Sequence, residues 1–267
     1  MSRPHVTSQN GIAKELVYYH RSYRKIAVPE KRHLIPLLFF ILIIEVFLYL
    51  FFPDINSLIN EYTQKILIRS VSLENVRMIR AEFLWRPITV LDIPGTYPAR
   101  GFTIINMVVA LLIIFILPQT KTPKPITIPL TLMSLIHLVS ALLFLFVPDR
   151  FPYQVIDFST TYVAMVVITW FLIPVVYGFT LYPLPSSILS KIGMMLFTIV
   201  FSATFNIFRY SLFLYLIHIH SFIFMAILFF CFGFLVDMIF IVGFYSFYLN
   251  LLSRKLKQDM DVWQWLY

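Results

Sequence analysis

The sequence predicts an all-α, polytopic membrane protein with six transmembrane helices and both termini in the cytoplasm. Of its 267 residues, 60% are hydrophobic and only 13% are charged, and the mean hydropathy is +0.84. Soluble globular domains carry a larger charged share. Moreover, apolar runs of about 20 residues, the length that crosses a bilayer, alternate with polar stretches. These two observations exclude a soluble protein.

Six apolar runs are long enough to cross a membrane. They cover residues 34–52, 102–118, 126–147, 158–181, 192–217 and 222–250. Because lipid offers no hydrogen-bond partner to the backbone, each run must be a helix. Gly233 and Gly243 in the long last run are typical of tight helix packing or of a bend. Residues 34–252 therefore form one six-helix membrane domain.

The positions of Lys and Arg predict the orientation of this domain. Residues 1–33 are rich in both, and Lys121, Lys124, Lys191 and Arg254 fall on the same side after six crossings. We therefore expect the N-terminal segment and the tail at 253–267 to be cytoplasmic and the protein to lie in the cytoplasmic (inner) membrane. The connections at 53–101, 148–157 and 218–221 are then extracytoplasmic. The net charge of +8 reflects this orientation, so no nucleic-acid partner is expected.

Three segments outside the spans carry patterns of their own. Residues 12–28 place apolar side chains on one helical face and Arg and Lys elsewhere, which predicts an amphipathic helix on the inner leaflet or against a cytoplasmic partner. Residues 55–66 also repeat apolar residues at helical spacing, which predicts a helix that lies on the outer membrane surface or caps the bundle. The tail ends in Trp263-Gln264-Trp265-Leu266-Tyr267, which either returns to the membrane interface or binds a partner.

The large outer connection changes character after this second helix. Pro87, Pro94 and Pro98 break helical patterns. We therefore expect an irregular segment over residues 83–97 with one short strand.

Polar residues inside the spans are the most informative positions. They are Glu45, His137, Asn206, Arg209 and Asp237. A charge in the hydrocarbon region persists only when it is paired or used for function. Depths counted along the helices place Glu45, His137 and Arg209 in the outer half of the membrane, where they can meet, and Asp237 deeper. The simplest expected ion pair is therefore Glu45 with Arg209.

Asn206 and Arg209 lie three residues apart on one helical face, where an amide and a guanidinium can hold an oxyanion. The alternative is structural: Asn206 bonds between helices and Arg209 only pairs with Glu45. Likewise, His137 reads as a helix-contact histidine and Cys231 as buried packing.

Two positions near the outer face are further candidates for chemistry. His218 and His220 flank the outer turn, either as a metal-binding or proton-relay pair or as a wetted polar turn. Residues 157–161 (Asp-Phe-Ser-Thr-Thr) open the fourth span, either as a helix cap or with Ser159 as a nucleophile. No phosphate-binding loop, zinc-protease motif or nucleotide fingerprint is present, so no cofactor or metal is expected.

Residues 150–250 resemble the exosortase and archaeosortase family of multi-pass membrane transpeptidases, which process C-terminal sorting signals of surface proteins. The resemblance rests on residues 156–161, on the Asn206-x-x-Arg209 pattern and on Gly233-Phe234-Leu235-Val236-Asp237, which follow the family's order and topology. It implies an outward-facing site, with Arg209 as the residue that carries over directly.

The sequence departs from the family at two positions. Ser159 stands where the family has its nucleophilic Cys, and Val236 stands where it has a basic His or Arg. A serine hydroxyl needs a positioned base, which here only His218 or His220 can supply. The resemblance therefore predicts a degenerate member that keeps the fold and has lost or altered the activity.

Three functions follow from these observations. The first is a non-catalytic or altered, exosortase-like component of a cell-envelope assembly for surface-protein or exopolysaccharide processing or export, with membrane-protein partners. The second is a transpeptidase or protease that uses Ser159, Arg209 and His218 or His220. The third is a small transporter or proton-coupled channel along Glu45, His137, Arg209 and Asp237.

Overall fold

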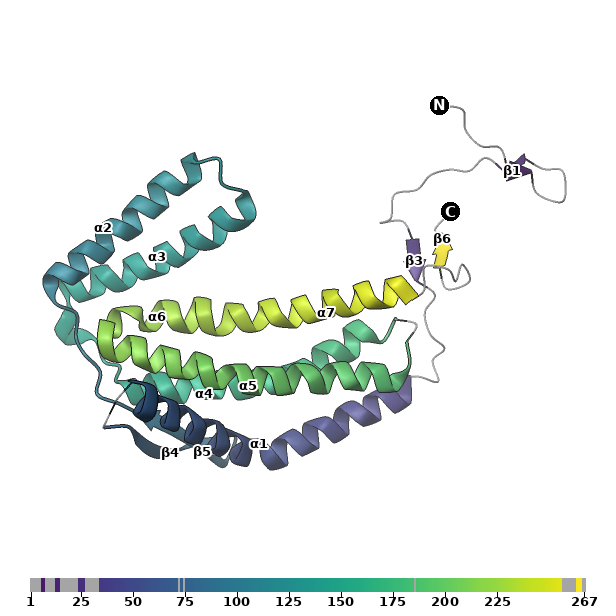
Figure 1. Ribbon diagram of the computed structural model, residues 1–267, viewed down its shortest axis with the longest axis horizontal. Coiled ribbons are helices and arrows are strands. Elements are labelled where there is room, and N and C mark those ends of the chain that lie inside the picture. The colour runs from purple at the N-terminus through teal and green to yellow at the C-terminus, as the bar shows by residue number, and fades with distance from the viewer. Residues whose placement is uncertain are drawn as a thin grey trace.

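The protein is a bundle of long helices with a β-hairpin at one end (Figure 1). The computed structural model describes residues 6–7, 13–14, 24–26, 34–71, 73, 75–184, 186–255 and 263–265. The long helices are α1 (Leu34–Val71), α2 (Arg100–Ile116), α3 (Lys124–Phe146), α4 (Val155–Leu181), α5 (Ile188–His220) and α7 (Val236–Lys255). The π-helix η6 (Leu228–Leu235) and the short α6 (Met225–Ile227) join α5 to α7 through the 3-10 turn η5 (Phe222–Phe224).

In the part of the chain that the structure describes, six helical segments are long and apolar enough to cross a membrane, which confirms an all-α multi-pass membrane protein. They are Leu34–Ser70, Arg100–Gln119, Lys124–Phe146, Val155–Leu181, Ile188–His220 and Phe222–Arg254. The first segment begins at the same end of the bundle at which the last segment ends (Figure 1), as an even number of crossings requires. We call this the inner end and the opposite one the outer end.

Helix α1 combines two elements that the sequence separates. The first span and the apolar pattern at 55–66 form one helix of 38 residues with Pro53 inside it, and its direction changes near the middle (Figure 1). The outer helix is therefore confirmed as a helix, but it continues the span.

An arginine compensates for the proline in α1. Pro53 has no N–H, so the carbonyl of Tyr49, four residues earlier, loses its helical partner. The Nη1 of Arg86 donates to that oxygen at 2.8 Å and to the oxygen of Leu50 at 3.1 Å. The bend in α1 therefore keeps its backbone hydrogen bonds satisfied.

The segment predicted as irregular with one strand, 83–97, does contain one strand, residues 86–92, followed by residues without regular structure. The prediction missed the partner strand before it, because residues 77–92 form an antiparallel hairpin. Strands β4 (Arg77–Phe83) and β5 (Arg86–Asp92) are joined by Leu84 and Trp85. Pro87 faces Glu82, one pair beyond the turn-flanking pair Phe83–Arg86. In this register its nitrogen points away from β4, where the ladder needs no donor.

Side chains from two helices cover the edge of β5 that faces away from β4. The Thr89 carbonyl on this edge accepts from the Nδ2 atoms of Asn56 and Asn60 at 2.7 and 2.9 Å. The Leu91 N–H on the same edge donates to the Tyr210 hydroxyl at 3.2 Å. The hairpin is thus attached to α1 and α5 by hydrogen bonds that replace a third strand.

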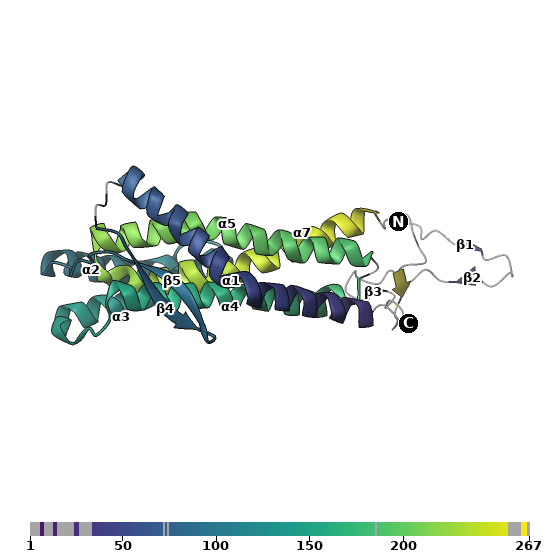
Figure 2. The same cartoon turned by 90° about the horizontal axis from the view of Figure 1, so that it is seen from below.

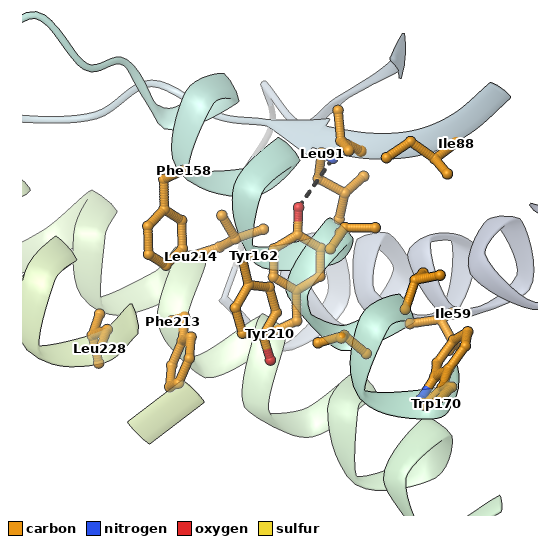
Figure 3. Close-up of a cluster of buried hydrophobic side chains, with 14 of the residues drawn as sticks. Ile59, Ile88, Leu91, Phe158, Tyr162, Trp170, Tyr210, Phe213, Leu214 and Leu228 are labelled. Carbon is orange, nitrogen blue, oxygen red and sulfur yellow. Dashed lines mark hydrogen bonds between the residues drawn. The ribbon is translucent and has the colours of Figure 1, made fainter. Parts of the chain in front are cut away.

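The core lies between α4, α5 and the hairpin (Figure 3). Tyr162, Tyr210 and Trp170 are fully buried or nearly so, and the rings of Tyr162 and Tyr210 stack with centroids 5.2 Å apart. The indole N–H of Trp170 donates to Ser202 at 3.2 Å, and the Tyr177 hydroxyl donates to the Ile241 carbonyl at 2.8 Å. Helix α4 is therefore the central helix, linked to both α5 and α7.

Helices α2 and α3 form a hairpin that diverges from the other helices (Figure 1). Their contact buries small and polar side chains, Thr103 and Ala110 on α2 and Ser134 and Ala141 on α3. Small residues allow the close backbone approach typical of membrane helix pairs. The pair joins the bundle through contacts of α3 with α6 and η5 near the outer end.

The described parts of the termini are short strands. β1 (Val6–Thr7) pairs with β2 (Ala13–Lys14), and β3 (Arg24–Ile26) pairs with β6 (Trp263–Trp265). Most of the predicted amphipathic segment 12–28 and of the tail at 253–267 lies outside the described residues.

Candidate functional site

A polar network lies in the middle of the bundle, between α4, α5, η6 and α7. The Arg209 guanidinium is its centre: Nε donates to the Tyr162 hydroxyl at 2.7 Å, and Nη1 donates to Asp237 Oδ1 at 2.5 Å and to the Gly233 carbonyl at 3.2 Å. The Tyr162 hydroxyl in turn donates to Asn206 Oδ1 at 2.5 Å. Four segments are thus joined through one arginine.

The network is closed to solvent. Asp237 is fully buried, and Arg209 is 5% exposed. The rings of Tyr162 and Phe205 lie 5.5 and 5.7 Å from the guanidinium carbon, within the range of cation–π attraction. The cation is therefore stabilised by an anion, by neutral acceptors and by aromatic rings at once, as a buried charge requires.

The π-helix explains how a backbone carbonyl takes part. A π-helical turn shifts the backbone hydrogen bonds and often marks a functional position. Gly233 lies in this turn, and a Cβ on it would come within 3.1 Å of Met165 Cε and 3.6 Å of Tyr162 Cε2. The absence of a side chain thus lets η6 approach α4 closely enough for Arg209 to reach the carbonyl.

The predicted ion pair between Glu45 and Arg209 is wrong, because Arg209 pairs with Asp237. Counting depth along the helices does not tell which face of α5 carries the guanidinium, and this face turns toward α4 and α7. Glu45 on α1 is half-buried, and its Oε1 has no hydrogen-bond partner among the described residues.

His137 does not meet Glu45 or Arg209, and its interpretation as a helix-contact histidine is confirmed. Its Nε2 lies 3.0 Å from Asn106 Oδ1, and its ring stacks on Phe224 with centroids 5.0 Å apart. This places it between α2, α3 and η5, as a helix-contact histidine.

Ser159, Arg209, His218 and His220 do not form a catalytic group in this structure. Ser159 is fully buried on α4, and its Oγ has no hydrogen-bond partner in the described part of the chain. The Nδ1 of His218 lies 2.7 Å from the Pro94 carbonyl oxygen, and the His220 ring stacks on Phe102. No base is hydrogen-bonded to the Ser159 hydroxyl.

The residues just before Ser159 act as a helix cap. Helix α4 has Gln154 as its N-cap residue, and the backbone N–H of Gln154 donates to Asp157 Oδ2 at 2.8 Å. This capping box satisfies a backbone donor at the helix start, so the structural interpretation of this segment is confirmed, with the cap three residues earlier than Asp157.

The outer turn borders a small cavity of about 290 Å³, lined by Thr96, Tyr97, Pro98, Ala99, Phe102, Ile219, His220 and Ser221. Ser221 has a φ of 108°, a conformation that non-glycine residues rarely adopt. Its strained backbone is held by the connection before α2, because the Phe222 N–H donates to the Thr96 carbonyl at 3.0 Å.

Two further predictions concern the single cysteine and a metal site. Cys231 is buried and free. Across the described ranges, no three His, Cys, Asp or Glu side chains lie close enough together to hold a metal ion.

The chain matches no protein-family model, no curated protein and no solved structure. The fold and the composition define the class of this protein, a six-helix multi-pass membrane protein. The resemblance to exosortases rests on the sequence patterns alone.

Two members of the network were not recognised from the sequence. The Tyr162 hydroxyl, which links Arg209 to Asn206, looks in the sequence like one more aromatic residue of an apolar span. The Gly233 carbonyl is a backbone group, which accepts from the Val236 N–H as well as from Arg209 and leaves no signal in the sequence.

Proposed function

We propose that this protein is an exosortase-like, non-catalytic membrane component of a cell-envelope assembly that processes or exports surface proteins or exopolysaccharide. The observation that carries the proposal is the position of Arg209, whose Nε and Nη1 donate to Tyr162, Gly233 and Asp237 inside the closed bundle. A residue that stabilises an oxyanion must direct its N–H donors at the substrate. Nε and Nη1 of Arg209 are instead bonded to groups of the protein itself.

The surroundings of Ser159 support the same conclusion. A serine nucleophile needs a base within hydrogen-bond distance and a route for the substrate. Ser159 is fully buried, and the two histidines predicted as its base, His218 and His220, contact Pro94 and Phe102 instead. On this proposal, the residues that match the family pattern serve the packing of the helices and not catalysis.

The α2–α3 hairpin supports a role in an assembly. Few of its residues are buried within the chain: Thr103 and Ala110 on α2 and Ser134, His137, Ala141 and Phe144 on α3. Since the hairpin diverges from the bundle (Figure 1), both helices present apolar faces on which helices of a partner membrane protein can pack.

The experiment compares three strains of the organism that carries the gene: wild type, a deletion and Ser159→Ala. Mass spectrometry of the C-termini of surface proteins, with an assay of secreted polysaccharide, reports the pathway. We expect the deletion to change one of these outputs and Ser159→Ala to behave as wild type. A Ser159→Ala strain that matches the deletion, with normal protein abundance, would show that the serine is catalytic.

A further inference from the structure

The turn of the β-hairpin has an unusual sequence for its backbone. Leu84 and Trp85 form a two-residue connection between β4 and β5, and their φ values are 49° and 58°. Turns with two left-handed residues strongly prefer Asn-Gly, because a Cβ makes this conformation unfavourable. Leucine and tryptophan therefore do not serve the turn itself.

The same two residues are exposed. Trp85 is 93% exposed, the largest exposure of any large hydrophobic side chain in the described part of the chain, and Leu84 is 38% exposed. Seen from below, the turn projects from the side of the bundle (Figure 2). Among the described residues, no contact of the indole ring explains its presence in this position.

Hydrogen bonds fix the height of the turn along α1. At the outer end of the hairpin, the Gln64 side chain donates to the Val76 carbonyl. Midway, Asn56 and Asn60 bond to Thr89. At the turn, Arg86 bonds to the carbonyls of Tyr49 and Leu50. The hairpin thus runs back along α1, and its turn is the part nearest the membrane.

The turn lies level with residues 49–52 of α1, where the apolar run that we expect to form the first span ends. Tyr49 and Phe51 of α1 are both exposed there, and the Arg86 guanidinium lies over the rings of Tyr49 and Phe52 at 5.6 and 5.9 Å. Trp, Tyr and Arg at a span boundary are typical of the membrane–water interface.

We propose that the Leu84–Trp85 turn inserts into the interfacial region of the outer leaflet and anchors the hairpin to the lipid surface. The interface accommodates an indole ring, whose apolar body contacts acyl chains while its N–H bonds to headgroups or water. We name lipid as the binding partner because the turn projects at the level of the exposed Tyr49 and Phe51, where the apolar run of α1 ends.

The test uses the purified full chain in phosphatidylcholine vesicles. Subtracting the tryptophan emission of Trp85→Phe from that of the wild type gives the emission of Trp85. We expect a blue-shifted difference spectrum, quenched more strongly by lipids brominated near the headgroup than near the chain end. Emission typical of water, quenched by iodide, would overturn the proposal, and so would a blue-shifted emission that no brominated lipid quenches, since that indicates a second protein copy.

A second variant separates anchoring from turn stability. Leu84→Asn with Trp85→Gly supplies the residues that this turn prefers. If the turn only connects the strands, amide hydrogen exchange of β4 and β5 in vesicles should slow or stay the same. We expect it to become faster, because the anchor is lost although the turn is improved. Unchanged or slower exchange would contradict the proposal.

Discussion

Replacing Asp237 with Asn removes the only anion that pairs with Arg209 among the described residues. The two side chains are 0% and 4% exposed, and the Asn side chain leaves the guanidinium charge buried and uncompensated. Breaking a buried pair in this way costs about 3–5 kcal/mol. For a chain of this size that corresponds to a decrease in melting temperature of roughly 10 °C.

The decisive comparison is a double-mutant cycle. Arg209→Met with Asp237→Leu removes both charges and keeps the bond between Tyr162 and Asn206, so we expect it to recover most of the stability lost by either single variant. The assay is unfolding in mixed micelles with increasing SDS, followed by circular dichroism of the purified chain. It yields the free energy of unfolding for each variant.

Glu45→Gln is the matched control, because Glu45 is the acidic residue within the apolar run 34–52, and Arg209 forms its salt bridge with Asp237 and not with Glu45. We expect a small effect that adds independently to that of Arg209→Met. If Glu45→Gln rather than Asp237→Leu showed strong coupling to Arg209→Met, or if the double variant lost the sum of both single effects, the reasoning from the structure would be refuted.

Three further variants test individual buried or bonded polar groups, and the same unfolding assay measures each. Tyr162→Phe leaves two buried polar groups without the bridging hydroxyl and should cost about 1–3 kcal/mol; a neutral result would contradict the network. Arg86→Ala uncovers the carbonyl freed by Pro53 and should cost about 1–2 kcal/mol in the wild type but less in Pro53→Ala, whose restored N–H bonds that oxygen; equal costs would disprove the compensation. Ser159→Ala removes an unpartnered hydroxyl and should change stability by less than about 0.5 kcal/mol; a large loss would indicate a hidden bond.

The number and type of the membrane helices could be predicted from the sequence, because a bilayer requires long apolar helices and little else satisfies the backbone. The partner of Arg209 could not be predicted from the sequence. Which charge it meets depends on the face that α5 turns inward and on the π-helix at Gly233, and neither leaves a periodic pattern.

The hairpin was missed for a related reason. Proline normally interrupts strands, but Pro87 occupies a position where its missing N–H is not needed. Sequence alone does not give the register that makes this position harmless. Likewise, Asn56 and Asn60 appear as polar residues of an amphipathic helix, although they complete the edge of β5.

The central claim, a non-catalytic component of an envelope assembly, is tested most directly by purifying the tagged protein from native membranes in mild detergent and recording its intact mass. We predict a complex in which a second membrane protein accompanies the chain in constant ratio, equally in wild type and in Ser159→Ala. A homogeneous species with the mass of the chain, 31.5 kDa, plus the tag, free of any other protein in several mild detergents, would contradict the claim.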